Sequence, residues 1–176
     1  VFTNREMKES DFRNDVLPLK NKLFRLALRI TLKREEAEDI VQETLLKVWK
    51  CMNEGKDIDN IEAFAMTACR NMAIDASEKK EKQNISLDEA MLERQDTAHA
   101  PDEVLMEAEN EHIVTTTINS LPEKQRTAIQ LREIEGKTYK EIALIMGLTE
   151  ADVKVNIFRA RKRIKEILTK THRHGL

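Results

Sequence analysis

The acidic residues between positions 34 and 43 are the groups in this sequence whose spacing comes closest to a catalytic arrangement. The stretch REEAEDIVQE sets carboxylates at helical i, i+3 and i+4 positions, and carboxylates so placed can hold Mg²⁺. Such a site needs a second acidic pair on a facing helix. On the helix predicted at 61–80, only Asp75 and Glu78 have that spacing, and two lysines follow them directly. A magnesium-dependent nucleotide hydrolase is therefore the weakest of the functions that we consider.

Other catalytic or metal-binding patterns are missing from the sequence. We find neither a Ser/His/Asp set nor a glycine-rich phosphate loop. The two cysteines, Cys51 and Cys69, lie in apolar helical patterns, as reduced core cysteines of a cytosolic protein do. His172 and His174 belong to a basic tail. We therefore expect a binding protein without a catalytic residue, a cofactor or a metal.

Residues 138–164, TYKEIALIMGLTEADVKVNIFRARKRI, have the chemistry of a nucleic-acid-binding surface. They form two helical patterns joined at Gly147, a residue type that suits a left-handed turn. From Glu150 onward eight Lys and Arg residues stand against three acids, in a chain whose net charge is only −2. This segregation of charge indicates a helix-turn-helix whose basic second helix binds phosphates.

The second helix of this motif is predicted to have one buried and one exposed face. The apolar positions at helical spacing are Val153, Ile157, Ala160, Ile164 and Leu168. The opposite face includes an aromatic ring, which suits contact with thymine methyl groups in a major groove. The side chains that we predict to contact duplex DNA are Lys154, Val155, Phe158, Arg159 and Lys162.

The elements that must position these groups are all predicted to be helical. Charged residues make up 35% of the chain and aromatic residues 4%, with Gly 4 and Pro 3, and alternating β-branched runs are absent. Apolar periodicity predicts seven helices. They span about residues 11–32, 34–52, 61–80, 103–119, 121–134, 139–146 and 150–169.

An acidic segment divides these helices into two blocks. Residues 83–109 hold eight acids and one base, and Pro101 interrupts any long helix. We expect a flexible linker at 83–102 between an all-α domain at 10–82 and another at 103–170. Because no run of about 18 apolar residues and no signal peptide is visible, we expect a cytoplasmic protein without membrane insertion.

Three capping boxes are expected to define helix starts in the second block. Each pairs a Ser or Thr with an acid three residues later, so that the two side chains satisfy orphan amides reciprocally. The pairs are Ser120 with Glu123, Thr138 with Glu141, and Thr149 with Asp152. We expect the helix boundaries here to be more reliable than those in the first block.

The helix at 34–52 carries a polar strip that folding alone does not explain. Burial of its apolar stripe leaves outward-facing polar residues around one leucine. The strip consists of Asp39, Gln42, Glu43 and Leu46. A solvated face is the usual explanation of exposed acids. The leucine among them favours a docking surface for another protein.

Taken together, these segments resemble the small, two-domain extracytoplasmic-function group of bacterial sigma-70 factors. AEDIVQETLLKVW (37–49) is similar to region 2.2 of that family, and IEAFAMTACRNMAID (61–75) to regions 2.3 and 2.4. Residues 118–164 are similar to region 4. The resemblance extends over about residues 11–168, and the order and spacing of the motifs are more specific than any one motif.

The resemblance implies a sigma factor that binds core RNA polymerase and directs it to promoters. The strip on the helix at 34–52 would dock on the clamp helices of the β′ subunit, and the β flap is a second implied contact. The helix-turn-helix would read the −35 element. The residues implied to contact the −10 element are Asn60, Phe64, Arg70, Asn71, Lys79 and Lys80. An anti-sigma factor is a further expected partner.

The alternative function is a stand-alone transcription regulator that uses the helix-turn-helix. Such a regulator would account for residues 103–170 equally well. It would leave the strip on the helix at 34–52 and the loop at 53–60 without a function.

Overall fold

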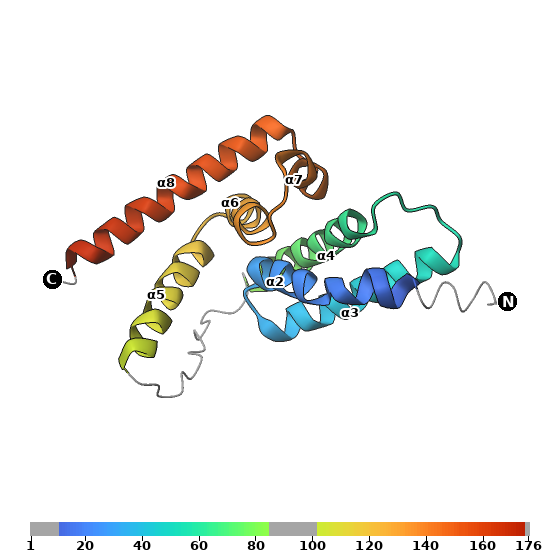
Figure 1. The fold of residues 1–176 in the computed structure, drawn as a ribbon, viewed down its shortest axis with the longest axis horizontal. Helices are drawn as coiled ribbons and strands as arrows, with labels where there is room; N and C mark the ends of the chain where they lie inside the picture. The colour runs from blue at the N-terminus through green and yellow to red at the C-terminus, as the bar shows by residue number, and fades with distance from the viewer. Residues whose placement is uncertain (1–10, 85–101, 175–176) are drawn as a thin grey trace.

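The computed structural model describes residues 11–84 and 102–174, and its regular elements in these ranges are all helical (Figure 1). The α-helices are α2 (Lys20–Thr31), α3 (Arg34–Asn53), α4 (Ile61–Asn84), α5 (Asp102–Asn119), α6 (Glu123–Ile129), α7 (Tyr139–Met146) and α8 (Glu150–His174). The prediction of an all-α chain is confirmed. Most of the predicted linker, residues 85–101, lies outside the described residues.

Helices α2, α3 and α4 pack on one another around an apolar core. The side chains from this part of the chain with no exposed surface include Leu23, Leu26, Ala37, Val48, Ala65, Met66 and Cys69. Except for Met66, which was not predicted to be buried, they fall on helical stripes predicted from the apolar spacing, because the period of 3.6 residues places them on one side of each helix. Burial of each large side chain contributes about 1.5–3 kcal/mol.

The single helix predicted for residues 11–32 is wrong, because it overlooked Pro18. The chain there forms a π-helical turn at Phe12–Val16, a 3-10 turn at Leu17–Leu19 and then α2. Proline lacks the amide hydrogen that an uninterrupted helix requires, and its ring clashes with the preceding turn. The proline is tolerated because it stands in the first turn of a new helical segment.

A left-handed residue ends α2 and lets α3 pack back on it. Leu32 has φ 59°, and it is the one residue other than glycine with positive φ in the described ranges. A bulky side chain in this conformation costs about 1 kcal/mol. The buried hydroxyl of Thr31 donates to the carbonyl of Ala27 and accepts from the amide of Lys33, so the turn is held by side-chain hydrogen bonds.

The helix-turn-helix forms at α7 and α8 as predicted. The Thr138 hydroxyl accepts from the Glu141 amide at 3.2 Å, and the Glu141 carboxylate accepts from the Thr138 amide at 2.7 Å, so this capping box is complete. The bond from the Thr138 amide, and a second bond of 2.8 Å from the Thr138 hydroxyl to the same carboxylate, lower the pKa of Glu141. Gly147 closes α7 with φ 62°, the left-handed conformation predicted from its position.

The other two predicted capping boxes have different outcomes. Thr149 accepts from the Asp152 amide at 3.1 Å and so caps α8, but the Asp152 carboxylate accepts from the Thr149 hydroxyl at 2.6 Å in place of its amide, so this box is only half formed. The Ser120 box is wrong, because its hydroxyl donates to the Thr117 carbonyl at 2.7 Å instead. Pro122 occupies the position before α6, so Ser120 lies too early in the chain to cap that helix.

The two helical blocks pack against each other. α6 contacts α2, and α7 contacts α4, and buried residues from both blocks belong to one hydrophobic cluster. Figure 1 shows α6 and α7 beside α2 and α4, with α8 along the outer edge of the molecule. The arrangement leaves different amounts of α4 and α8 open to solvent.

Candidate nucleic-acid and protein interfaces

Helix α8 has the two faces that its sequence predicts. Val153, Ile157 and Ala160 are at most 2% exposed and pack on the domain core. All five residues predicted to contact duplex DNA lie exposed on the outer face. Phe158 is 68% exposed, which is costly for a phenylalanine unless a partner covers it. The face therefore combines apolar and cationic groups, as contact with base edges and phosphates requires.

The tyrosine at the start of α7 positions one of these cations. The Nζ of Lys154 lies 5.4 Å from the centre of the Tyr139 ring, and the guanidinium carbon of Arg132 lies 4.6 Å from it. Each of the two cations is attracted to the negative charge on the face of the aromatic ring. Arg132 also donates to the Lys137 carbonyl at 2.8 Å. Sequence reasoning missed this group, although Tyr139 is the one tyrosine in the chain.

The basic residues of α8 divide into those with acidic partners and those without. Arg161 forms an ion pair with Glu133, whose hydrogen bond raises the pKa of the arginine. Arg159 and Lys162 are exposed and have no ion-pair partner among the described residues. The unpaired cations lie on the same helix as Phe158 and are available to phosphates.

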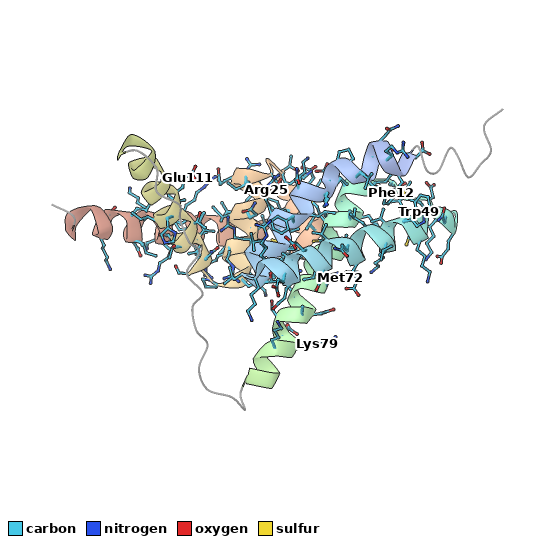
Figure 2. All side chains as sticks on the ribbon, turned by 90° about the horizontal axis from the view of Figure 1, so that it is seen from below. Phe12, Arg25, Trp49, Met72, Lys79 and Glu111 are labelled. Atoms are coloured by element: carbon cyan, nitrogen blue, oxygen red, sulfur yellow. The ribbon has the colours of Figure 1, made fainter. Side chains whose placement is uncertain are left out.

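The strip on α3 lies beside an apolar groove that the sequence did not predict. Asp39, Gln42 and Glu43 are exposed, and Leu46 is 66% exposed. The groove has a volume of about 560 Å³, and its lining includes Phe12, Leu17, Gln42, Leu46 and Trp49. The rings of Phe12 and Trp49 meet edge to face at 5.0 Å (Figure 2). An exposed apolar groove with polar groups at its edge is suited to a protein partner.

A second groove lies in the C-terminal domain and was also missed. It has a volume of about 520 Å³ and lies between α5, α8 and the π-helical turn Gln130–Ile134. Its apolar lining includes Val114, Ile118, Ile129, Ile134, Ile164 and Leu168. Arg161 and Lys165 stand among the lining residues. The sequence pattern assigned Ile164 and Leu168 to a core face and not to an open groove.

The six residues assigned to the −10 element do not form one open surface. Asn60 accepts a hydrogen bond from the Ala63 amide at 2.9 Å and so caps α4. Phe64 is half-buried against the core. Lys80 is tied to Glu36 by an ion pair. Asn71 and Lys79 are exposed, and Figure 2 shows Lys79 on the part of α4 that projects from the body of the molecule.

Arg70 is the member of this group that the fold covers most. It is 9% exposed, and its Nη2 atom lies 3.6 Å from Oε1 of Glu123 on α6. Its Nε atom is buried without a hydrogen-bond partner among the described residues. In this arrangement the C-terminal domain therefore covers Arg70, one of the residues predicted to contact DNA.

The residues that could have supported catalysis are not assembled. Within the part of the chain that the structure describes, no three His, Cys, Asp or Glu side chains are grouped so as to hold a metal ion. Cys51 and Cys69 are buried and unpaired, and burial raises the pKa of Cys69 to about 12. None of the described helices has the length and apolar character to cross a bilayer.

Comparison with known families assigns both blocks. Residues 16–83 match the family described as Sigma-70 region 2, and residues 111–164 match Sigma-70, region 4. The N-terminal match accounts for the block that a stand-alone helix-turn-helix regulator left without a function. The alternative function is therefore not favoured.

Individual relatives agree with this assignment. The ECF RNA polymerase sigma-E factor of Haemophilus influenzae is 30% identical over 155 residues, covering 82% of this chain and 80% of that protein. The RNA polymerase sigma-H factor of Pseudomonas aeruginosa is 28% identical over 161 residues, covering 87% of this chain and 83% of that protein.

A solved structure has a similar arrangement of helices. The sigma factor RpoE of Bartonella quintana, in complex with the anti-sigma factor NepR, matches with a TM-score of 0.72 and 26% identity over 90% of this chain and 97% of RpoE. The chain thus belongs to the extracytoplasmic-function group of the sigma-70 family: it is a sigma factor, which directs promoter-specific initiation of transcription and has no catalytic activity of its own.

Proposed function

We propose that the outer face of α8 reads the −35 element as duplex DNA. The observation that carries this proposal is the 68% exposure of Phe158 on a helix whose neighbouring cations lack acidic partners. In a major groove the ring contacts thymine methyl groups, while Lys154, Arg159 and Lys162 contact base edges and phosphates. The capped start of α8 holds these side chains in a fixed register.

The strip on α3 and the groove beside it form the proposed surface for core RNA polymerase. Leu46 and the edge-to-face pair of Phe12 and Trp49 supply apolar contact area, and Asp39, Gln42 and Glu43 supply polar contacts at its margin. Such a pairing of an apolar centre with a polar rim is usual in protein interfaces. We assign this surface to the β′ clamp helices and the groove of the C-terminal domain to the β flap.

Helix α4 and the loop before it are the proposed −10 surface. Exposed Asn71 and Lys79 are positioned to line a single strand, and Phe64 offers a ring edge near the start of the helix. Bases of a melted strand stack on aromatic rings, while lysines attract the backbone. Asn60, Arg70 and Lys80 complete the set once their present partners release them.

A protein partner and a cellular location complete the proposal. Because the similar RpoE structure contains an anti-sigma factor, we infer that this chain also binds one. Its location is proposed to be the cytoplasm, where core polymerase and promoter DNA are found. The two domains are proposed to span 10–82 and 103–170, with the linker at 83–102 between them.

In vitro transcription tests the proposed division of labour. Core polymerase is assayed with and without the full chain on a pool of promoter DNA, and the selected promoters are then cut to single elements. We expect transcripts only when the chain is present and a shared sequence at both elements. Tight, specific binding of the chain alone to duplex promoters, without transcription, would contradict the proposal.

A further inference from the structure

We propose that the face of α2 and α4 and the face of α6 and α7 form a self-closing interface that withholds α4 from promoter DNA. Four groups of polar contacts hold it, and no partner protein is needed. The inference rests on the proposed −10 role of α4 for its consequence but not for the closure itself. The carrying observations are ion pairs and hydrogen bonds that join residues far apart in the sequence and bury one or both of the partners in part or in full.

The first contact joins α2 to the end of the π-helical turn in the C-terminal domain. Arg25 donates to Glu135 through two bonds of 2.8 Å each, a bidentate geometry that fixes direction as well as distance. The side chain of Glu135 is 1% exposed. Figure 2 labels Arg25 at the centre of the molecule, where α2 meets the C-terminal helices. If the domains separated, the Arg25 guanidinium and the Glu135 carboxylate would each be hydrated instead of paired.

The second contact is a shared carboxylate at the start of α4. Glu62 lies 2.9 Å from Nζ of Lys22 in its own domain and 2.8 Å from Nζ of Lys137 in the other. Lys137 is 9% exposed, and a lysine is seldom buried to this extent unless an acid pairs with it, as Glu62 does here. Burial alone would raise the pKa of Glu62, but the hydrogen bonds from the two lysines outweigh it and lower the pKa.

The third contact is a pair of arginines that cross the interface in opposite directions. Arg29 of α2 donates to Asn119 at 2.7 Å and to Gln130 at 3.0 Å. Arg126 of α6 donates to the Ile30 carbonyl at 3.3 Å. Burial lowers the pKa of both arginines, and for Arg29 the nearby charge of Arg126 lowers it further. The closed form therefore contains electrostatic repulsion between Arg29 and Arg126, which separation of the two domains would relieve.

The fourth contact withholds Arg70. Its guanidinium has only a 3.6 Å ion pair with Glu123 in place of short hydrogen bonds, and its Nε is unsatisfied. A buried charge with incomplete pairing is poorly stabilised. A DNA phosphate offers two oxygens to a guanidinium and would satisfy it better. Closure and DNA binding therefore compete for the same side chain.

These contacts make closure reversible. The apolar cluster continues across the interface, but its rim is ionic, as in transient interfaces between domains. Exposed charges are screened over about 10 Å at 0.1 M salt. Higher ionic strength should therefore loosen the exposed side of the Arg25 pair more than the buried contact at Lys137.

The test reverses one charge and then restores the pair. Arg25→Glu sets two carboxylates against each other, and Arg25→Glu with Glu135→Arg returns opposite charges with their order exchanged. Lys20→Glu makes the same change of charge five residues earlier on α2 and serves as the control. Circular dichroism of each full-length variant checks that its helices are intact.

Small-angle X-ray scattering measures closure without any DNA. We expect Arg25→Glu to increase the radius of gyration, the double variant to return it to the wild-type value, and Lys20→Glu to leave it unchanged. Like charges opposed at an interface should shift the ratio of open to closed molecules by roughly tenfold or more. An unchanged radius for Arg25→Glu would overturn the proposal.

Transcription with core polymerase measures the consequence. We expect Arg25→Glu to reach half-maximal transcription at a severalfold lower concentration than wild type, and the double variant to reverse this gain. An expanded chain without any gain would overturn the withholding of α4. If wild type directs no transcription at all, the proposed function fails, while the scattering result still decides the closure.

Discussion

Helices α4 and α8 are both assigned to promoter DNA, yet the fold treats them differently. α4 packs against α2, α3 and α7, so much of its surface is inside the molecule. α8 packs on its own domain along one face, and its other face is open. Arg70 is 9% exposed and Phe158 is 68% exposed. A DNA-binding helix that contributes to a core on several sides needs a domain movement before it can bind, and a helix with one buried face does not.

The cations of the two helices show the same difference, since two on α4 are paired with acids and two on α8 are not, among the residues that the structure describes. On α4, Arg70 and Lys80 have acidic partners from other helices. On α8, Arg159 and Lys162 have no ion-pair partner in the described ranges. We therefore expect the proposed −35 surface to be ready to bind, whereas the proposed −10 surface would have to exchange internal partners for phosphates.

The largest expected effect concerns the open helix. Phe158→Ala should weaken promoter use through the −35 element by about 1–3 kcal/mol, roughly fivefold to 150-fold, because it removes an apolar base contact. Holoenzyme is assayed on promoters with an intact and a scrambled −35 element. Leu144→Ala, at a 64% exposed leucine on α7, is the control. An equal loss on both promoters would contradict the assigned face.

The next prediction concerns the proposed polymerase-binding strip on α3, which is distinct from the two helices assigned to DNA. Asp39→Ala with Leu46→Ala should weaken binding to core polymerase by about 2 kcal/mol, or about thirtyfold, because it removes an apolar anchor and a polar contact. Glu78→Ala changes an exposed acid on α4 and should have no such effect. Binding is measured by fluorescence anisotropy of labelled chain. Unchanged affinity would count against the strip.

A smaller effect tests the competition at α4. Glu123→Gln keeps the shape of the side chain but removes the charge that holds Arg70. Half-maximal transcription should need about twofold to fivefold less protein, since an ion pair of this kind contributes about 0.5–1 kcal/mol. Glu111→Gln, an exposed acid on α5, is the control. If both variants behave like wild type, Arg70 is not withheld by Glu123.

Salt dependence distinguishes phosphate contacts from base contacts on α8. Lys162→Ala should lower the slope of log affinity against log salt by about 0.9, the value for one lost phosphate contact. Phe158→Ala should lower affinity and leave the slope as it is. The slopes are measured by titrating holoenzyme on promoter DNA at several salt concentrations. A slope that does not change with Lys162→Ala would remove this lysine from the interface.

The smallest expected effect concerns the left-handed residues that end α2 and α7, Leu32 and Gly147. Leu32→Gly should stabilise the chain by about 0.5 kcal/mol, because glycine relieves the strain at φ 59° but loses more entropy on folding. Gly147→Ala should do the opposite, since the same conformation with φ 62° then carries a side chain. Urea unfolding of the full chain measures both. Destabilisation by Leu32→Gly would show that this turn is not strained.

Helix identity could be predicted where sequence signals are local. The bounds of α7 agree with prediction because the Thr138 capping box and Gly147 both mark its ends. Pro18 and Pro122 account for the errors, since each sets a helix start that apolar periodicity does not register. The outer face of α8 was predictable because one buried stripe determines the opposite side.

The interface between the domains could not be predicted in the same way. Arg25, Glu62 and Glu135 look like ordinary solvated charges in the sequence, because periodicity separates apolar from polar positions but does not pair polar ones. Lys137 gave no signal of its burial for the same reason. The grooves beside Trp49 and Ile164 were missed because an apolar residue in a helical stripe is normally assigned to a core.

The interface between α6–α7 and α2–α4 joins two parts of a single chain, so its closure is a unimolecular event. Each face meets the other at an effective concentration in the millimolar range, whatever the number of molecules in the cell. Neither dilution nor overproduction changes the fraction of open molecules. A partner selective for the open form binds with an affinity reduced by that fraction, and one selective for the closed form gains a surface assembled in advance.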